Sequence, residues 1–360
     1  MSTDTVLVEE LPIPRSMDTP EAAAFTELID IGNLIETQAL GTDALTLPAR
    51  QLLSDYQAQE DHPVRIFVAR ADGRIVGTGH LSWQPEDDAT VTWAEVEVLP
   101  QYRRRGIGTA LLDHLTTLAL ASGRPTLQAA VIHSRPGGGE RVEAPTGFGW
   151  LSDADPGVRF LLARGYRLEQ VARISALPLP VDPELLAAKR AAAQAAAGDD
   201  YRIVGWTGPT PADRVDDLVT LMARMSTDIP TAALETTDEQ WDAARLARVD
   251  DLLAATGRTR LTVAAEHVPT GRLAGHNVLV LPRDRSRPVI QEDTLVLSEH
   301  RGHRLGMLLK VANLQRLAEL SPSSTLVTTF NAEENRHMLD VNEAVGFAPI
   351  GYEGCWQLTP

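Results

Sequence analysis

The chain has 360 residues, 43% of them hydrophobic and 23% charged, which predicts two globular domains of about 150–200 residues each. Its 33 basic and 49 acidic residues give a net charge of −16, which argues against a nucleic-acid partner, because phosphate binding needs a basic surface. The single cysteine, Cys355, excludes an intrachain disulfide. No apolar run could cross a membrane and the N-terminus lacks a signal-peptide pattern, so we expect a cytoplasmic protein with no membrane partner.

Apolar residues at helical spacing open the first half of the chain, and strand-like runs follow them. An Asp-Gly pair, Asp72-Gly73, predicts a tight turn between the first two strands. The predicted elements of this half, in chain order, are helices at 20–40 and 48–59, strands at 64–69, 74–82 and 90–99, a helix at 105–122, a strand at 126–132, a helix at 157–164 and a strand at 166–177.

An alanine-rich run at 187–197 separates the two halves and predicts a semi-rigid helical spacer, since alanine has the highest helix propensity. We therefore place an N-terminal domain at 1–180, a linker at 181–199 and a C-terminal domain at 200–360.

The second half repeats the first at a fixed offset of 198 residues. Gly73-Arg74-Ile75-Val76-Gly77 recurs as Gly271-Arg272-Leu273-Ala274-Gly275 (271 − 73 = 198), and Arg103 and Gly108 recur as Arg301 and Gly306. The same offset over more than thirty residues predicts two copies of one fold. The predicted elements of this half are helices at 211–225 and 238–256, strands at 260–266, 272–281 and 289–297, a helix at 303–320, a strand at 325–330, a helix at 334–345 and closing strands to residue 358.

A glycine-containing turn joins the strand at 90–99 to the following helix. Its sequence is Tyr102-Arg103-Arg104-Arg105-Gly106-Ile107-Gly108-Thr109. Free backbone N–H groups and the positive end of a helix dipole bind phosphate at such a turn, and glycine lets an anion approach the backbone closely. Leu111 in place of a third glycine excludes the dinucleotide fingerprint, and the absence of Gly-Lys-Ser/Thr excludes the phosphate loop of nucleotide hydrolases.

Arg-x-x-Gly-x-Gly after a strand that ends Val-x-Val-x-Pro resembles the pyrophosphate motif of the GNAT superfamily, the acyl-CoA-dependent N-acetyltransferases. There is also some local similarity to the tandem mycothiol synthases in Pro-Gln-x-Arg-Arg-Arg-Gly-Ile-Gly-Thr. The resemblance implies an α+β (α/β) fold of two tandem domains, each with a mostly antiparallel mixed central sheet flanked by helices. It also implies acetyl-CoA, or another acyl-CoA, as co-substrate. His300 and His303 have arginines beside them and no evident third ligand, so we expect no metal.

The resemblance assigns cofactor-binding residues in both copies. In the first copy, the strand amides would face the acetyl-pantetheine arm and the turn would hold the pyrophosphate; these residues are Val96, Glu97, Val98, Arg103, Arg104, Arg105, Gly106, Ile107, Gly108 and Thr109. The corresponding residues of the second copy are Val296, Arg301, Gly302, His303, Arg304, Leu305, Gly306 and Met307. Arg304 replaces the first glycine, and we expect a helical backbone there, which would suit arginine and preserve the N–H donors.

Each copy lacks a different part of the family pattern. Asn335 stands where the family has an asparagine that touches cofactor, and Asn342 replaces the tyrosine that often protonates the departing sulfur. An amide cannot act as that acid, so Asn342 is a candidate catalytic position with altered chemistry. In the first copy the tyrosine position is Leu161 and the asparagine position is Ala154, and an insertion at 133–150 shortens the offset to 181 (346 − 165).

Acetyl transfer needs a base near the acceptor amine. Glu95 and Glu97 alternate on the strand at 90–99, so they share one face, and Asp293 occupies the Glu95 position in the second copy (293 − 95 = 198). Two neighbouring carboxylates raise the pKa of one of them and favour a base, although a structural role on the sheet is the alternative.

The sequence leaves two functions open. The first is an N-acetyltransferase acting on a small-molecule amine, with at least one active half. The second is a sensor of CoA or a small ligand, or a structural protein, with both halves catalytically degraded. A homodimer is also left open.

Overall fold

The computed structural model describes residues 6–133 and 137–359 and divides the chain into two compact units. Unit 1 comprises the described residues up to Ala172, the segment Thr231–Thr237 and the residues from Gly351 onward. Unit 2 comprises Arg173–Pro230 and Asp238–Ile350. The first unit is therefore built from both halves of the sequence.

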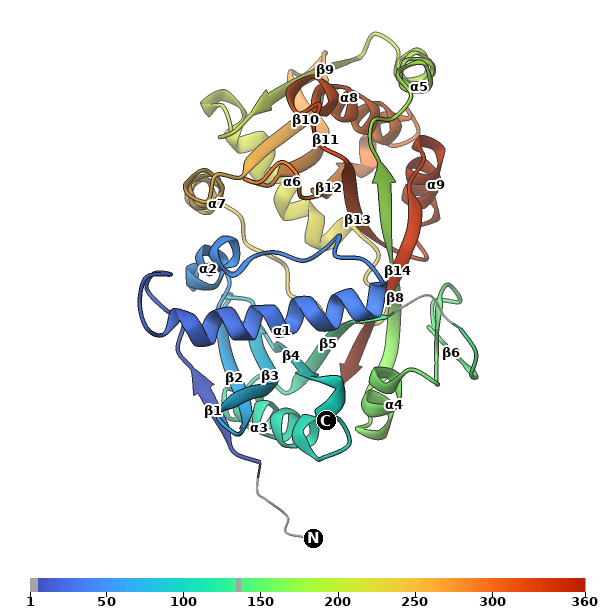
Figure 1. Ribbon diagram of the computed structural model, residues 1–360. Helices are drawn as coiled ribbons and strands as arrows, with labels where there is room; N and C mark the ends of the chain where they lie inside the picture. Colours follow the sequence, from blue (N-terminus) through green and yellow to red (C-terminus); the bar gives the residue numbers. More distant parts are fainter. Residues whose placement is uncertain (1–5, 134–136, 360) are drawn as a thin grey trace. The chain divides into compact units, whose positions relative to one another are not determined.

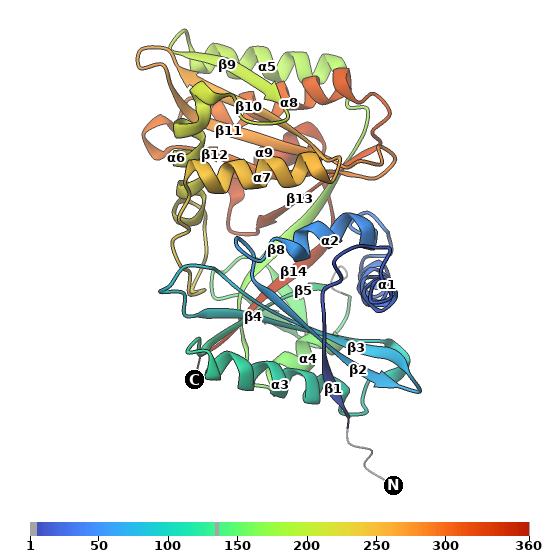
Figure 2. The ribbon, with the colours of Figure 1, turned by 90° about the vertical axis from the view of Figure 1, so that its left-hand side faces the viewer.

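The elements of unit 1 are β1 (Val8–Leu11), α1 (Ala22–Leu40), α2 (Ala49–Gln57), β2 (Val64–Ala71), β3 (Arg74–Trp83), β4 (Val91–Val98), η1 (Pro100–Tyr102), α3 (Ile107–Ala121), β5 (Thr126–His133), β6 (Arg141–Glu143), β7 (Trp150–Ser152), α4 (Pro156–Ala163), the first half of β8 (Arg167–Pro178) and most of β14 (Ala348–Leu358). Strands β1 to β5 follow one another in the sheet, and β14 lies next to β5. Helices α1 and α2 cover one face of this sheet, and α3 and α4 the other (Figures 1 and 2).

The elements of unit 2 are α5 (Pro183–Ala197), β9 (Tyr201–Thr207), η2 (Ala212–Arg214), α6 (Val215–Asp228), α7 (Ala243–Ala255), β10 (Thr259–His267), β11 (Arg272–Leu281), β12 (Val289–Val296), η3 (Ser298–His300), α8 (Leu305–Leu320), β13 (Leu326–Ala332) and α9 (Arg336–Val345), together with the rest of β8. Its sheet runs in the order β13-β12-β11-β10-β9. Helices α5 and α8 lie on one face, and α6 and α7 on the other (Figure 2). The predicted fold class, with mostly antiparallel sheets flanked by helices, is confirmed in both units.

The predicted helices and strands are present with small shifts at their ends. Asp72 and Gly73 both have positive φ (51° and 77°), as a two-residue hairpin turn requires. The sequence analysis missed β1, β6, β7 and β9. Strand β1 is short and polar at its centre, with Glu9 and Glu10 paired to Arg70 and Arg65 of β2, so it carries no clear hydrophobic period. In the insertion, β6 pairs with β7, and residues 134–136 lie outside the described residues.

The repeated glycine near the start of the second hairpin strand has a packing function. A Cβ atom on Gly77 would lie 2.8 Å from Ile107 Cγ2, and one on Gly275 would lie 2.5 Å from the Leu295 carbonyl oxygen. Both distances are too short for any side chain, so these glycines allow close packing beside the turn in each unit.

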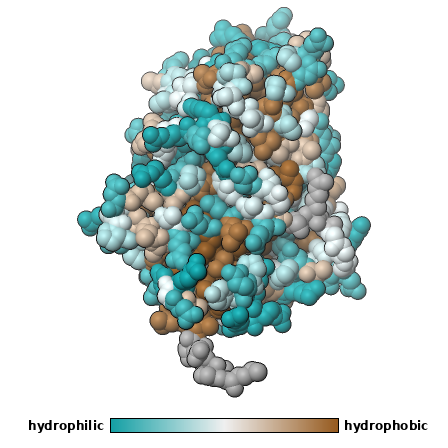
Figure 3. Space-filling view, viewed as in Figure 1, coloured by the Kyte–Doolittle hydropathy of each residue, from teal (hydrophilic) through white to brown (hydrophobic). Residues whose placement is uncertain are grey.

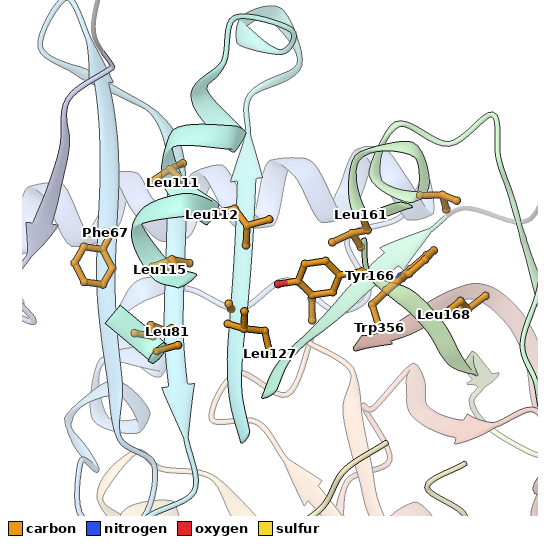
Figure 4. Packing of buried hydrophobic residues seen from close by; sticks show 14 of the residues in the cluster. Phe67, Leu81, Leu111, Leu112, Leu115, Leu127, Leu161, Tyr166, Leu168 and Trp356 are labelled. Atoms are coloured by element: carbon orange, nitrogen blue, oxygen red, sulfur yellow. The ribbon is translucent and has the colours of Figure 1, made fainter. Parts of the chain in front are cut away.

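The main core of unit 1 lies between its sheet and helices α3 and α4. Figure 4 shows leucines of α3, Leu127 of β5, Tyr166 and Trp356 packed together, with the Tyr166 hydroxyl directed toward Leu112 and Leu127. Trp356 belongs to β14 and is 0% exposed, so the last strand of the chain completes the core of the first unit. On the face shown in Figure 3, hydrophilic residues dominate and hydrophobic surface gathers below α1. Within the described residues, the search for a helix long and apolar enough to cross a membrane found none.

Candidate active site

The turn after β4 presents an open backbone at the start of α3. Arg104 and Gly106 both have positive φ, 64° and 82°, and residues 103–106 are exposed. A Cβ atom on Gly106 would meet nothing within 4 Å. The first N–H groups of α3 have no acceptor within the helix, so this open turn leaves donors available to an anion.

The turn of unit 2 has the same backbone with the two residue types exchanged. Here Gly302 has φ 90° and Arg304 has φ 54°. The expectation of a right-handed helical backbone at Arg304 is wrong: the residue is left-handed and precedes the first residue of α8. Each turn therefore places one glycine and one arginine at its two left-handed positions, and the second turn keeps the geometry of the first.

The first arginine of each turn holds the end of the preceding strand. Arg103 Nε donates to the Val98 carbonyl oxygen at 2.9 Å, and Arg301 Nε donates to the Val296 carbonyl oxygen at 3.1 Å. The structure thus gives both side chains a positioning contact within the turn. Arg105, by contrast, lies over the ring of Tyr102, 5.2 Å from its centroid, and is exposed.

Strands β4 and β5 run parallel and then part. Their paired residues are Val91 with Thr126, Thr92 with Leu127 and Trp93 with Gln128. Leu99 N–H donates to the Val76 carbonyl oxygen of β3. Successive residues of an antiparallel strand direct their N–H and C=O groups to opposite sides, so those of Val96 and Val98 point away from β3. The opening between β4 and β5, here called the fork, is therefore lined on the β4 side by N–H and C=O groups of Val96 and Val98.

Glu95 reaches across this fork. Its Oε1 accepts a hydrogen bond from Ala130 N–H of β5 at 3.4 Å. Burial is the largest cause that raises its pKa to about 7, followed by the charge of Glu353, with a smaller contribution from Glu97. Burial therefore raises the pKa of Glu95 more than the neighbouring carboxylate of Glu97 does, although the sequence pattern pointed to that pair.

Glu97 lies on the same face of β4, next to α1. Its Oε2 accepts from Thr78 Oγ1 at 3.3 Å and lies 3.3 Å from where a Cβ on Gly32 would be. Burial raises the pKa of Glu97, while the Thr78 hydrogen bond and the charge of Arg103 oppose that rise. Glu97 is therefore packed beside α1, whereas Glu95 lies at the fork.

A tyrosine and a histidine complete this face. Tyr56 Oη and His80 Nε2 are 3.1 Å apart, and His80 pairs with Glu95 in the sheet. Burial lowers the pKa of His80 to about 4, so the imidazole is neutral near pH 7. Burial and the charges of Glu97 and Glu95 raise the pKa of Tyr56, so its hydroxyl stays protonated. Sequence analysis missed both residues, since neither lies in the recognised motif.

Glu353 of β14 was also missed. It pairs with Ile132 of β5, and burial raises its pKa to about 7. Its charge is one of the causes of the raised pKa of Glu95. The alternation of residues in the closing strand was visible in the sequence, but nothing local indicated that this strand joins unit 1.

Unit 2 presents different chemistry at the corresponding positions. The three steps of β12 from Gln291 to Thr294 face only two steps of β11, from Leu279 to Asn277, so Asp293 lies in a β-bulge that β4 lacks. Burial raises its pKa to about 6; Arg260 opposes this rise and Glu239 adds to it. Leu295 occupies the position of Glu97, and His276 that of Thr78 (276 − 78 = 198). His276 is 0% exposed, neither ring nitrogen has a hydrogen-bond partner among the described residues, and burial lowers its pKa to about 4.

The two asparagines of α9 serve different contacts. Asn335 Oδ1 accepts from Met338 N–H at 3.3 Å and caps the helix. Asn342 is buried, and its Nδ2 donates to Asn331 Oδ1 at 2.6 Å. The structure brings Asn342 together with Asn331. In the described part of the chain, no group of three or more His, Cys, Asp or Glu side chains could hold a metal ion.

Comparisons with known proteins agree with this geometry. Residues 34–136 match the model of the Acetyltransferase (GNAT) family. An L-2,4-diaminobutyric acid acetyltransferase of Nocardia farcinica (strain IFM 10152) is 28% identical over 144 residues, which are 38% of this chain and 72% of that protein.

Solved structures match the whole length of the chain. A tandem GNAT protein from the clavulanic acid biosynthesis pathway is 26% identical, with 98% of both chains covered and a TM-score of 0.71. A GCN5-related N-acetyltransferase from Sphaerobacter thermophilus, 14% identical with a TM-score of 0.63, covers 99% of this chain and 96% of its own, and shows the shared fold alone.

The family match therefore covers the strand, turn and helix of unit 1, and the chain resembles a tandem GNAT protein over nearly its whole length. Residues 34–136 belong to the GNAT family, and the chain is an N-acetyltransferase.

Proposed function

We propose that unit 1 transfers an acetyl group from acetyl-CoA to the amine of a small molecule, by direct attack of the amine on the thioester. The observation that carries this proposal is Glu95, a half-buried carboxylate with a pKa near 7 that spans the fork in the unit with the open turn. A base with a pKa near the working pH is the most effective proton acceptor. The division into tandem GNAT-like domains at 1–180 and 200–360, joined by 181–199, is part of the same proposal, except that Thr231–Thr237 and the residues from Gly351 onward complete unit 1.

The turn and the strand would hold the co-substrate. The turn at 104–109, in which residues 104–106 and Thr109 are exposed, and the positive end of α3 suit the CoA pyrophosphate. The N–H groups of Val96 and Val98, which point into the fork, suit the thioester oxygen, where backbone donors stabilise the charge that develops during attack. Acetyl-CoA supplies the activated acetyl group.

The amine would react on the Glu95 side of the fork. Glu95 takes the proton that the ammonium must lose, the nitrogen forms a bond to the carbonyl carbon, and the bond from that carbon to sulfur breaks. The nitrogen loses its second proton to water as the amide forms. The departing thiolate is a tolerable leaving group, since a free thiol has a pKa near 8.5, so it can take its proton from water. Leu161 therefore does not prevent the reaction. The relative from Nocardia farcinica, named for a diamino acid, supports a small amine as acceptor.

Unit 2 favours the alternative role of ligand binding without turnover. It keeps the left-handed pair Gly302 and Arg304, but Leu295 replaces one carboxylate and His276 is buried without a partner among the described residues. We therefore propose that catalysis belongs to unit 1, and that unit 2 holds a coenzyme or contributes structure only.

Matched variants of the two units test this assignment. We expect Glu95→Gln to lower kcat by about a hundredfold or more, the usual contribution of a general base, and Asp293→Asn to leave kcat within about twofold. Release of free CoA thiol and the mass of the acetylated amine are the measurements. The opposite pattern would place catalysis in unit 2, and CoA binding without any release would support the sensor.

The pH dependence provides a second readout. Because only the ionised carboxylate can accept a proton, and Glu95 has a pKa of about 7, kcat/KM should fall as the pH drops through 7. A base with an ordinary glutamate pKa would instead keep its activity down to about pH 5.

A further inference from the structure

Glu353 adds a third carboxylate to the acceptor face of unit 1, defined here as the sheet face that carries Glu95 and Glu97. In the pairing of β14 with β5, Gln357 lies opposite Gln128, and the two side chains are hydrogen-bonded at 2.9 Å. Residues two apart on a strand share a face, so Glu353 lies on the face of Gln357, while Trp356 points into the core on the other side.

Glu95 reaches the same part of the sheet from β4. It bonds Ala130 N–H of β5, and Glu353 pairs with Ile132, two residues further along that strand. The two carboxylates interact, because the charge of Glu353 is the second cause of the raised pKa of Glu95. They therefore flank one stretch of β5.

No described cationic side chain forms an ion pair with these carboxylates, although the charge of Arg103 acts on Glu97. In the ranges 6–133 and 137–359, no ion pair within 4.0 Å joins an arginine, lysine or histidine to Glu95, Glu97 or Glu353. Glu353 also makes no hydrogen bond with the described residues, although it is partly buried. A carboxylate taken out of water without a partner costs free energy, and a bound cation would offset that cost.

We infer that Glu353 binds a second positively charged group of the acceptor, so that the preferred acceptors of unit 1 carry two amino groups. The inference rests on the proposed function, since Glu95 is occupied by the reacting amine. One carboxylate accepts the proton of that amine, and the other remains ionised beside the cation that does not react. Glu353 acts on specificity and takes no part in bond making or breaking.

The spacing of the strands limits the acceptor. Adjacent strands lie about 4.8 Å apart, so an alkyl chain of roughly three or more carbon atoms is needed between amino groups that bind Glu95 at β5 and Glu353 on β14. An aliphatic 1,4-diamine meets this requirement.

Binding measurements test the inference without relying on turnover. The probes are 1,4-diaminobutane and 1-aminobutane, titrated calorimetrically into the full-length protein. We expect the wild type to bind the diamine at least tenfold more tightly, Glu353→Gln to bind both equally, and Glu353→Asp to retain part of the preference. Equal binding by the wild type, or an unchanged preference in Glu353→Gln, would overturn the inference.

Two controls separate the alternatives. Glu143→Gln removes an exposed carboxylate of β6 in the same unit and should leave the preference intact. Circular dichroism and Tm establish that Glu353→Gln is folded. If the diamine preference depends on Glu353 but no amine is acetylated, the proposed function fails and the cation site stands. If amines are acetylated without a diamine preference, the proposed function stands and the role of Glu353 is wrong.

Discussion

Matching core residues differ in polarity between the two units. Leu112 and Leu115 of α3 lie in the apolar core of unit 1, whereas the residues 198 positions later in α8 are Lys310 and Asn313. Lys310 is 0% exposed, donates to Gln291 Oε1 at 2.7 Å, and lies 5.4 Å from the centroid of the Phe347 ring. With no carboxylate paired to it in the described chain, burial lowers its pKa to about 7.

Lys310 should therefore make the stability of the protein depend on pH. Its pKa is about 7 in the folded state and near 10.5 when exposed, so the unfolded chain binds more protons between these values. The free energy of unfolding should rise with pH from about 7 to 10, because the cost of burying this amine, roughly 1.4 kcal/mol per pKa unit, disappears once it is neutral in both states.

Lys310→Met tests this expectation. The variant should be more stable than the wild type at pH 7, by less than the full cost because Gln291 Oε1 loses its donor, and its stability should rise less between pH 7 and 10. Denaturant unfolding at several pH values measures both effects. Lys189→Met, which removes the other lysine of the sequence, is the matched control. A parallel pH dependence in Lys310→Met and the wild type would contradict the argument.

At the scale of elements, the strand–turn–helix units follow from local sequence. Their turns need two left-handed residues, and each unit supplies a glycine at only one of them. A side chain with a Cβ atom pays about 1–2 kcal/mol in the left-handed region. Arg104 at the first left-handed position of one turn and Arg304 at the second left-handed position of the other therefore each represent a stability cost.

Removal of that cost should stabilise each unit. We expect Arg304→Gly to raise the free energy of unfolding by about 1 kcal/mol or less, because the greater freedom of glycine in the unfolded chain offsets part of the gain. Arg104→Gly should act in the same direction, whereas Arg105→Gly, at a position without positive φ, should destabilise. Chemical denaturation of the three variants measures these changes in the free energy of unfolding. A loss of stability in Arg304→Gly would show that the Arg304 side chain makes a compensating contact.

The features that the sequence predicts correctly are those that depend on local patterns. Helical period, strand alternation and the Asp72-Gly73 turn predicted most elements, and the 198-residue offset predicted both copies of the fold. The alternation of Glu95 and Glu97 predicts that they share one face of their strand. Their catalytic roles, and those of Asp293 and Asn342, stay predictions.

The features that were missed depend on contacts between distant parts of the sequence. The bulge at Asp293 depends on the register of β12 against β11, and the residue types of Glu292 and Asp293 do not indicate it. Glu353 reaches the acceptor face only because β14 pairs with β5, more than two hundred residues earlier. No local propensity encodes such a pairing.

At the scale of the whole molecule, unit 1 depends on segments from the second half of the chain. Glu235 accepts hydrogen bonds from the hydroxyls of Thr90 and Thr126, and its backbone carbonyl accepts from Gln128. Gln357 of β14 accepts from the Glu235 N–H at 2.7 Å. The segment Thr231–Thr237 and β14 are therefore joined to the same strands of unit 1.

A chain that ends at residue 180 should consequently fail to fold as an independent enzyme. It would lack Trp356, a fully buried side chain whose removal alone typically costs about 3–5 kcal/mol, and would leave the inner edge of β5 unpaired. We expect residues 1–180 to show no cooperative thermal transition and no acetyl transfer. Adding residues 181–360 as a separate chain is the control, because it resupplies both missing segments and should restore a cooperative transition. A monomeric 1–180 fragment with the near-ultraviolet circular dichroism expected of a packed core would show that β14 is dispensable, and the acceptor face would then have to be complete without Glu353.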